Sequence, residues 1–143
     1  MSADGPGSPY VLDDQVGYLL RLASQRHAAI FQALMQHGLT PTQFSTLIRL
    51  AEIGSGSQNQ LGRLTAMDAA TIKGVVDRLK AKGLVTLSAD ATDGRRRMIA
   101  LSTEGRRILG ELEALGHRIT EATLEPLAED EQRTLVRLLR RLT

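Results

Sequence analysis

After the first ten residues, one short stretch of this chain departs from a helical repeat. On both sides of it, apolar residues recur every three to four positions, which is the pattern of amphipathic helices. Between residues 84 and 101 the pattern changes to two short β-type runs, Leu84–Ala89 and Met98–Leu101, separated by a polar tip with Asp93 and Gly94 at its centre. An Asp-Gly pair between such runs is a strong hairpin signal. The sequence therefore predicts a mainly helical fold with one small β-hairpin.

The helices around the hairpin have clear start signals. Four side chains suited to N-caps precede helical runs: Thr40, Ser57, Asp68 and Ser102. Pro41 and Gln43 complete a capping box after Thr40. The expected order is a long helix over 13–37, three shorter helices, the hairpin, a long helix ending before Pro126, and a last helix over about 129–142. The central helix–helix–hairpin unit is the arrangement of a winged helix-turn-helix.

The predicted elements divide the chain into a tail and one domain. Residues 1–10 are rich in Gly, Ser and Pro and are expected to form a flexible N-terminal tail. Residues 11–143 form a single domain, in which the winged helix covers about 40–102. The flanking helices, about 13–37 and 103–142, are too apolar to remain solvated alone. We expect them to pack on one another across a two-fold axis as dimerisation helices.

Composition excludes several kinds of chemistry. The 143 residues include no cysteine and no tryptophan, and aromatic residues make up 3%. These counts exclude thiol chemistry and a stacking surface for single-stranded nucleic acid. His27, His37 and His117 are too scattered to predict a metal site, and no cofactor is expected. No secretory signal or membrane span is recognisable, which favours a cytoplasmic protein. No catalytic constellation or phosphate-binding loop stands out, so the sequence predicts a non-enzyme without catalytic residues.

The distribution of charge is more informative than its total. The formal net charge is +2. Residues 57–100 contain eight basic and four acidic side chains, a net +4, whereas the rest has ten basic and twelve acidic side chains, a net −2. Arg95, Arg96 and Arg97 form a single-sign cluster at the expected hairpin tip. This concentration favours binding to DNA phosphates, although a merely solvated charged face is a common alternative.

The helix after Asp68 has the features of a DNA-recognition helix. Its apolar positions follow the helical repeat: Ile72, Val75, Val76 and Leu79. The opposite face carries small residues that allow close approach to a groove, and Thr71 and Lys73 can reach base edges. The arginine cluster would contact phosphates or enter the adjacent minor groove. The residues expected to contact DNA are Ser57, Gln58, Asn59, Asp68, Ala69, Ala70, Thr71, Lys73, Gly74, Arg78, Asp93, Arg95, Arg96 and Arg97.

The stretch from Ser57 to Gly105 resembles the MarR family of transcriptional regulators. The matching pieces are Gln58 with Leu61, Asp68 with Thr71, VDRL at 76–79, GLV at 83–85, Asp93 with Arg95, and Leu101, Ser102 and Gly105. The resemblance implies a homodimeric winged-helix protein, usually a repressor, that binds a pseudo-palindromic double-stranded operator. The family's usual Asp-Arg-Arg in the wing reads Asp93-Gly94-Arg95 here. Gly62 replaces the usual Ala, and Ala128 occupies the usual N-cap of the last helix.

The resemblance also implies a small-molecule effector, commonly an aromatic carboxylate, that releases the DNA. Family pockets lie between the dimerisation helices and the winged helix, lined by the first, second and fifth helices. The polar candidates there are Tyr18, Arg26, His27 and Arg49, since arginine binds carboxylates in a bidentate fashion; ordinary exposed positions are the alternative. The expected effector is an aromatic acid or its CoA thioester. The alternative function is a helical protein-interaction module without specific DNA binding.

Overall fold

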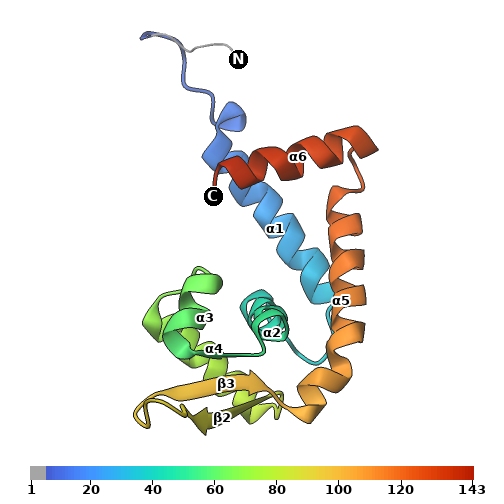
Figure 1. Ribbon diagram of the computed structural model, residues 1–143. Helices are drawn as coiled ribbons and strands as arrows, with labels where there is room; N and C mark the ends of the chain where they lie inside the picture. The colour runs from blue at the N-terminus through green and yellow to red at the C-terminus, as the bar shows by residue number, and fades with distance from the viewer. Residues whose placement is uncertain (1–5) are drawn as a thin grey trace.

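The computed structural model describes residues 6–143 and places a unit of short helices and a sheet below the first and last helices, with a long helix running up one side of the molecule (Figure 1). The elements are η1 (Leu12–Asp14), α1 (Val16–Leu34), α2 (Pro41–Ile53), β1 (Ser55–Ser57), α3 (Gln58–Leu64), α4 (Ala69–Ala81), β2 (Val85–Ala89), β3 (Arg97–Leu101), α5 (Thr103–Leu124) and α6 (Glu129–Arg141). The predicted winged helix-turn-helix is confirmed. Half of the expected flexible tail, residues 1–5, lies outside the described residues.

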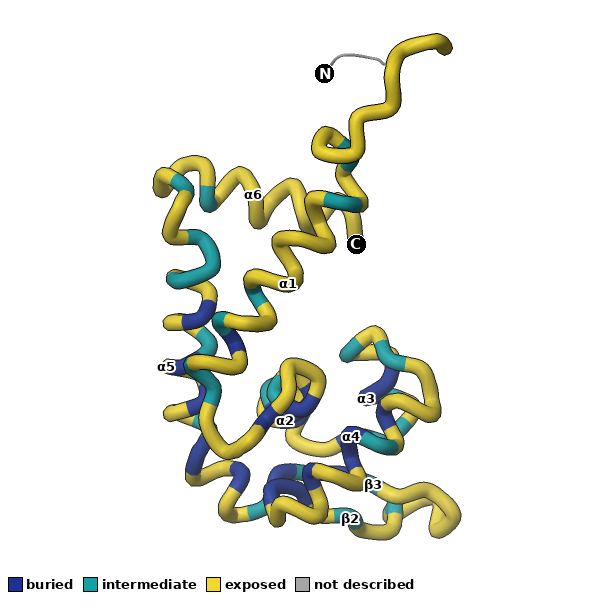
Figure 2. Tube along the Cα trace, turned by 180° about the vertical axis from the view of Figure 1, so that it is seen from behind, coloured by how far each residue is buried: buried dark blue, intermediate teal, exposed yellow. Residues whose placement is uncertain are grey.

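The core lies where α2, α3, α4 and the N-terminal half of α5 meet. Its fully buried side chains are mainly aliphatic: Leu47, Leu50, Leu61, Ile72, Leu79, Ile99, Ile108 and Leu112. Figure 2 shows this burial concentrated in the lower part of the molecule, whereas α6 and the N-terminal half of α1 are exposed. The four predicted N-caps all form, since Thr40, Ser57, Asp68 and Ser102 accept from the main-chain amide three residues further on. These caps fix the helices around the core.

The sheet contains one strand more than the sequence predicts. Its order is β1-β3-β2, and β3 pairs antiparallel with both neighbours. β1 consists of Ser55, Gly56 and Ser57, residue types that disfavour strands. The strand forms because Gly56 pairs with Ile99, which lies far away in the sequence. The predicted hairpin is confirmed; β2 starts one residue later than predicted, at Val85, and β3 starts one residue earlier, at Arg97.

The helix predicted over residues 13–37 is shorter than expected. A separate 3-10 turn holds residues 12–14, and Gln15 is extended before α1 begins at Val16. After Leu34 the chain leaves the helix, because Met35 is extended and His37 and Gly38 both have positive φ angles, 62° and 64°. This corner reverses the chain into α2. It ends α1 at Leu34, three residues before the predicted end at residue 37.

The flanking helices are partly packed within the chain. The C-terminal part of α1 contacts α5 within the chain. α6 has no buried residue, and its large apolar side chains are exposed: Leu135, Val136, Leu138, Leu139 and Leu142. Among residues 6–143, no helix is long and apolar enough to cross a membrane.

Candidate nucleic-acid interface

The N-terminal half of α4 is exposed on the face opposite the core. Ile72, Val75, Val76 and Leu79 are buried, whereas Ala69, Ala70, Thr71 and Lys73 are exposed. The Asp68 carboxylate accepts a hydrogen bond from the main-chain amide of Thr71 at 2.7 Å. Hydrogen bonds from Thr71, chiefly that of its main chain, lower the pKa of Asp68 below its usual range. The cap therefore stays charged at neutral pH and fixes the first turn of α4, whose residues Ala69, Ala70 and Thr71 are exposed.

Two further side chains on α4 have neighbours within the helix. Lys73 Nζ lies 2.8 Å from Asp77 Oδ2, and this hydrogen bond raises the pKa of Lys73. Gly74 is half-buried, and a Cβ atom there would lie 3.2 Å from Arg78 Nη1. The Arg78 side chain therefore passes close to the Gly74 backbone. Both cations remain exposed on the helix surface.

The wing tip is shaped by its two aspartates. The Asp90 carboxylate accepts from the main-chain amide of Thr92 at 3.0 Å and lies 3.4 Å from Arg96 Nε. The Thr92 amide is the main cause that lowers the pKa of Asp90. Asp93 accepts from the main-chain amide of Arg95 at 3.0 Å. Asp93 thus builds the turn that presents the arginines, which accounts for its presence in a cationic tip.

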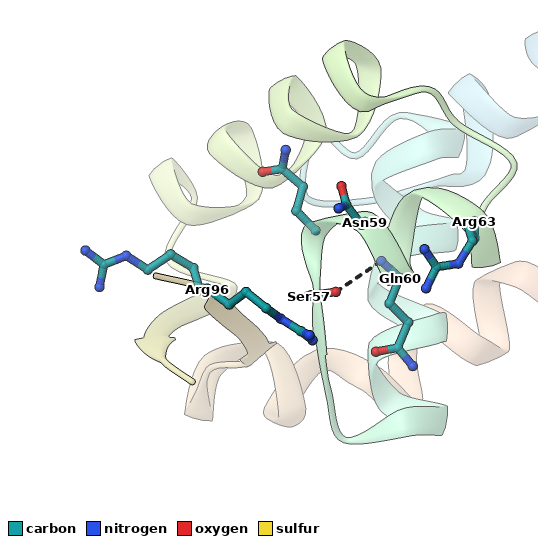
Figure 3. A pocket seen from close by; sticks show the side chains of 7 residues that line it. Ser57, Asn59, Gln60, Arg63 and Arg96 are labelled. Atoms are coloured by element: carbon teal, nitrogen blue, oxygen red, sulfur yellow. Dashed lines mark hydrogen bonds between the residues drawn. The ribbon is translucent and has the colours of Figure 1, made fainter. Parts of the chain in front are cut away.

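A depression of about 410 Å³ separates the wing from the start of α3 (Figure 3). It is lined by Ser57, Gln58, Asn59, Gln60, Arg63, Arg96 and Arg97. Its lining, as far as the described part of the chain goes, includes three arginines and no acidic side chain. Ser57 Oγ is engaged at the edge, where it accepts from the Gln60 amide at 3.2 Å. The surface is suited to a phosphate-rich partner.

The structure brings most of the predicted DNA residues onto two neighbouring places. Ser57, Gln58, Asn59, Arg96 and Arg97 meet at the depression, and Asp68, Ala69, Ala70, Thr71, Lys73, Gly74 and Arg78 lie on α4. Asp93 and Arg95 lie at the wing tip. Sequence reasoning missed Arg63, which lines the depression. Its position four residues after Asn59 puts both on one face of α3, and this spacing is the signal that identifies it.

The four predicted ligand residues are not brought into one site. Tyr18 packs against Arg21 at 5.5 Å from ring centroid to guanidinium carbon. Arg26 donates to the carbonyl oxygens of Ala122 and Thr123 at the end of α5. His27 Nδ1 lies 2.9 Å from Thr123 Oγ1, which itself donates to the Ile119 carbonyl oxygen. These three side chains lie on α1.

Arg49 lies elsewhere, on α2. Its Nε donates to the Leu64 carbonyl oxygen at 3.2 Å, and its Nη1 donates to Glu52 Oε2 at 2.9 Å. It borders a cavity of about 480 Å³ between α2 and the turn that joins α3 to α4. Arg49 is therefore the one predicted ligand residue that lines this cavity.

Comparisons with known proteins agree with this geometry. A model of the MarR family matches residues 37–96. The HTH-type transcriptional repressor NicR of Pseudomonas putida is 41% identical over 142 residues, which cover 99% of this chain and 90% of that protein.

Two solved structures extend the similarity to the fold. A probable transcriptional regulator from Pseudomonas aeruginosa is 55% identical with a TM-score of 0.90, covering 93% of this chain and 100% of that one. BpsR of Bordetella bronchiseptica, whose DNA binding is regulated by 6-hydroxynicotinic acid, is 39% identical with a TM-score of 0.88. That match covers 94% of this chain and 96% of BpsR.

Proposed function

The chain belongs to the MarR family of transcriptional regulators, and from that premise we propose that it is a homodimeric repressor released from its operator by a small aromatic acid. The observation that carries the DNA-binding part is the arginine-lined depression beside the exposed face of α4. A recognition helix and a cationic wing on one side of a unit suit the major groove and the flanking backbone.

We assign the DNA contacts to the predicted residues and to Arg63. The first turn of α4, with Ala69, Ala70 and Thr71, faces base edges, and the depression and wing contact phosphates. In the free protein Lys73 pairs with Asp77, so this exposed pair must open for Lys73 to reach a base or phosphate. An exposed pair of this kind contributes about 0–1 kcal/mol, which charge-assisted phosphate contacts can replace.

A homodimer accounts for the exposed apolar surface. The chain exposes 9898 Å², whereas a compact monomer of its mass exposes about 7,250 Å². A stable interface buries about 800 Å² on each partner, which is less than this excess. We assign about 13–37 and 103–142 to the dimer and about 40–102 to DNA reading, with recognition helices roughly 34 Å apart.

The effector is proposed from chemistry and from similar proteins. BpsR responds to 6-hydroxynicotinic acid, and NicR is a repressor. An aromatic acid of this kind, or its CoA thioester, is therefore the proposed effector class. Of the four candidates Tyr18, Arg26, His27 and Arg49, we favour Arg49 as the partner of the carboxylate, since Arg26 and His27 hold the end of α5.

The DNA-binding proposal is tested with the wing variant Arg95→Ala/Arg97→Ala. Binding is measured at 150 mM salt to the DNA upstream of the protein's own gene and to a scrambled duplex of equal composition. We expect the parent to prefer the upstream DNA and the variant to lose at least tenfold in affinity, with a shallower salt dependence.

A charge-matched variant, Arg107→Ala/Arg118→Ala, provides the control because both residues lie on α5 and outside the proposed DNA contacts. It should bind within about twofold of the parent. Equal affinity of the parent for both duplexes would remove the sequence-specific regulator. Unchanged affinity of the wing variant would favour the alternative, a helical interaction module.

A further inference from the structure

Asp90 anchors the tip of the wing. Residues 91–97 are all exposed, whereas the Asp90 side chain keeps only 15% of its surface exposed. Its main-chain amide donates to the Arg96 carbonyl oxygen at 2.9 Å, just beyond the last strand pair, Ala89 with Arg97. Asp90 and Arg96 are therefore neighbours at the base of the tip, in their main chains as well as in their side chains.

The two oxygens of the Asp90 carboxylate have separate tasks. Oδ1 accepts from the main-chain amide of Thr92 at 3.0 Å and from the Thr92 hydroxyl at 3.1 Å. Oδ2 lies 3.4 Å from Arg96 Nε and forms the ion pair. One oxygen thus builds the turn, and the other holds the arginine. This division means that a suitable substitution can remove the second contact and keep the first.

Arg96 is held in a way that leaves its guanidinium able to bind a phosphate. The ion pair runs through Nε, whereas four of the five N–H donors of an arginine lie on its two Nη atoms. Arg96 also lines the depression between the wing and α3 (Figure 3). Its Nη groups can therefore bind a phosphate in a bidentate manner while Nε remains on Asp90.

The Asp90 charge acts differently on different DNA. Binding without sequence preference depends on the positive charge that a protein brings to the phosphates, so an acid in the cationic wing opposes it. A guanidinium held in one orientation is useful only where a phosphate lies at a defined place. Such a place exists when base contacts select one register of the duplex. Asp90 therefore opposes binding to any duplex and favours binding in one register alone.

We propose that Asp90 is a positioning residue that sets the specificity of DNA binding by holding Arg96 in one orientation at the depression; this rests on the function proposed above. In the operator complex the held guanidinium meets its phosphate without first having to be ordered. On an unrelated duplex no phosphate is fixed at that place, and only the repulsion by Asp90 remains. Removing the Asp90 charge therefore weakens operator binding, although it makes the protein more positive.

The proposal is tested with Asp90→Asn, because asparagine keeps an oxygen for Thr92 and replaces Oδ2 by an amide that cannot pair with Arg96. Affinities for the upstream DNA and the scrambled duplex are measured under the conditions used for the wing variant. On the upstream DNA we expect a loss of about threefold or more, the range of one exposed ion pair. On the scrambled duplex we expect equal or tighter binding. Parent-like or tighter binding of Asp90→Asn to the upstream DNA overturns the proposal.

The route through Arg96 is tested by repeating the substitution in Arg96→Ala protein. If Asp90 acts by holding Arg96, Asp90→Asn causes no further loss of affinity for the upstream DNA in that background. An equal loss in both backgrounds would give Asp90 a structural role in the turn alone and would also overturn the proposal.

Glu104→Gln is the matched control, because it removes an acid paired with an arginine, Arg107, on α5. It should stay within about twofold of the parent on both duplexes. A parent that binds both duplexes equally removes the proposed function and this inference together. A parent that prefers the upstream DNA, combined with an Asp90→Asn protein that binds it as well, removes this inference alone.

Discussion

At the residue scale, two glycines of α5 are in opposite environments. A Cβ atom on Gly105 would overlap the carbonyl oxygen of Leu84, whereas a Cβ on Gly110 would meet nothing within 4 Å. The close approach at Gly105 seats the start of α5 against the strand region, where Ser102 N also donates to Leu84 O at 2.9 Å. The same substitution should therefore have opposite effects at the two positions.

We predict that Gly105→Ala destabilises the protein by about 1–3 kcal/mol, because the backbone must shift to relieve the overlap. Gly110→Ala should stabilise it by about 0.5–1 kcal/mol through helix propensity. Urea unfolding at one fixed protein concentration measures both. A stabilising Gly105→Ala would show that the helix and the Leu84 carbonyl are not packed together as described.

Single residues differ in how readily the sequence reveals their roles. The caps Ser57, Asp68 and Ser102 were predictable because each bonds to an amide three residues away. Arg26 was predictable only as a cation, since its carbonyl partner Thr123 is 97 residues distant. Distant partners leave no local spacing in the sequence, which is why the engagement of Arg26 and Arg49 emerges only from the fold.

At the scale of elements, the start of α4 depends on the charge of one carboxylate. The pKa of Asp68 lies below its usual value of 3.8 because Thr71 donates to the charged form. A depressed pKa contributes stability above the unfolded-state pKa, and that stability is lost as the pH falls through the folded-state value. Acid should therefore loosen the first turn of the recognition helix.

We predict that lowering the pH from 7 to 3 reduces the urea midpoint more in the parent than in Asp68→Asn. Asparagine is also a good N-cap but does not titrate. Other acids, including Asp90, are present in both proteins, so their contributions cancel in the comparison. Equal pH-induced shifts in the two proteins would mean that the Asp68 charge does not stabilise α4.

The elements that were not predictable are those fixed by tertiary contact. β1 exists because Gly56 pairs with Ile99, and nothing in the Ser-Gly-Ser sequence favours a strand. The early end of α1 follows from the corner at His37 and Gly38. By contrast, the hairpin was predictable, since its alternation and Asp-Gly turn are local. The wing tip therefore emerged from the sequence, and the third strand did not.

At the scale of the whole molecule, α6 exposes its apolar side chains, which no element within residues 6–143 buries. Its apolar residues Leu135, Leu138, Leu139 and Leu142 follow the i, i+3, i+4, i+7 repeat, and each is at least 36% exposed. A second copy of the chain is the occupant proposed above. Dimerisation should then depend on these side chains rather than on the basic residues of the same helix.

We predict that Leu138→Glu/Leu142→Glu converts a dimer to a monomer. Losing burial of two leucines costs about 3 kcal/mol or more, which corresponds to at least a 100-fold weaker dimer. Sedimentation velocity measures the association, and circular dichroism verifies that the helices remain. The apolar control Leu138→Met/Leu142→Met should stay dimeric. A glutamate variant that sediments as the parent does would place the dimer interface elsewhere.

The central position of β3 has a consequence for the entropy of binding. β3 pairs on one side with β2, the other strand of the wing, and on the other side with β1, which leads directly into α3. The hairpin is therefore anchored along one side to the helix-turn-helix. Only the tip between Ala89 and Arg97 extends beyond the paired strands. A freely hinged wing would lose backbone entropy of about 1–2 kcal/mol per residue immobilised on a duplex. In this protein folding has already ordered most of the wing, so affinity for DNA is limited mainly by contacts and by the short tip.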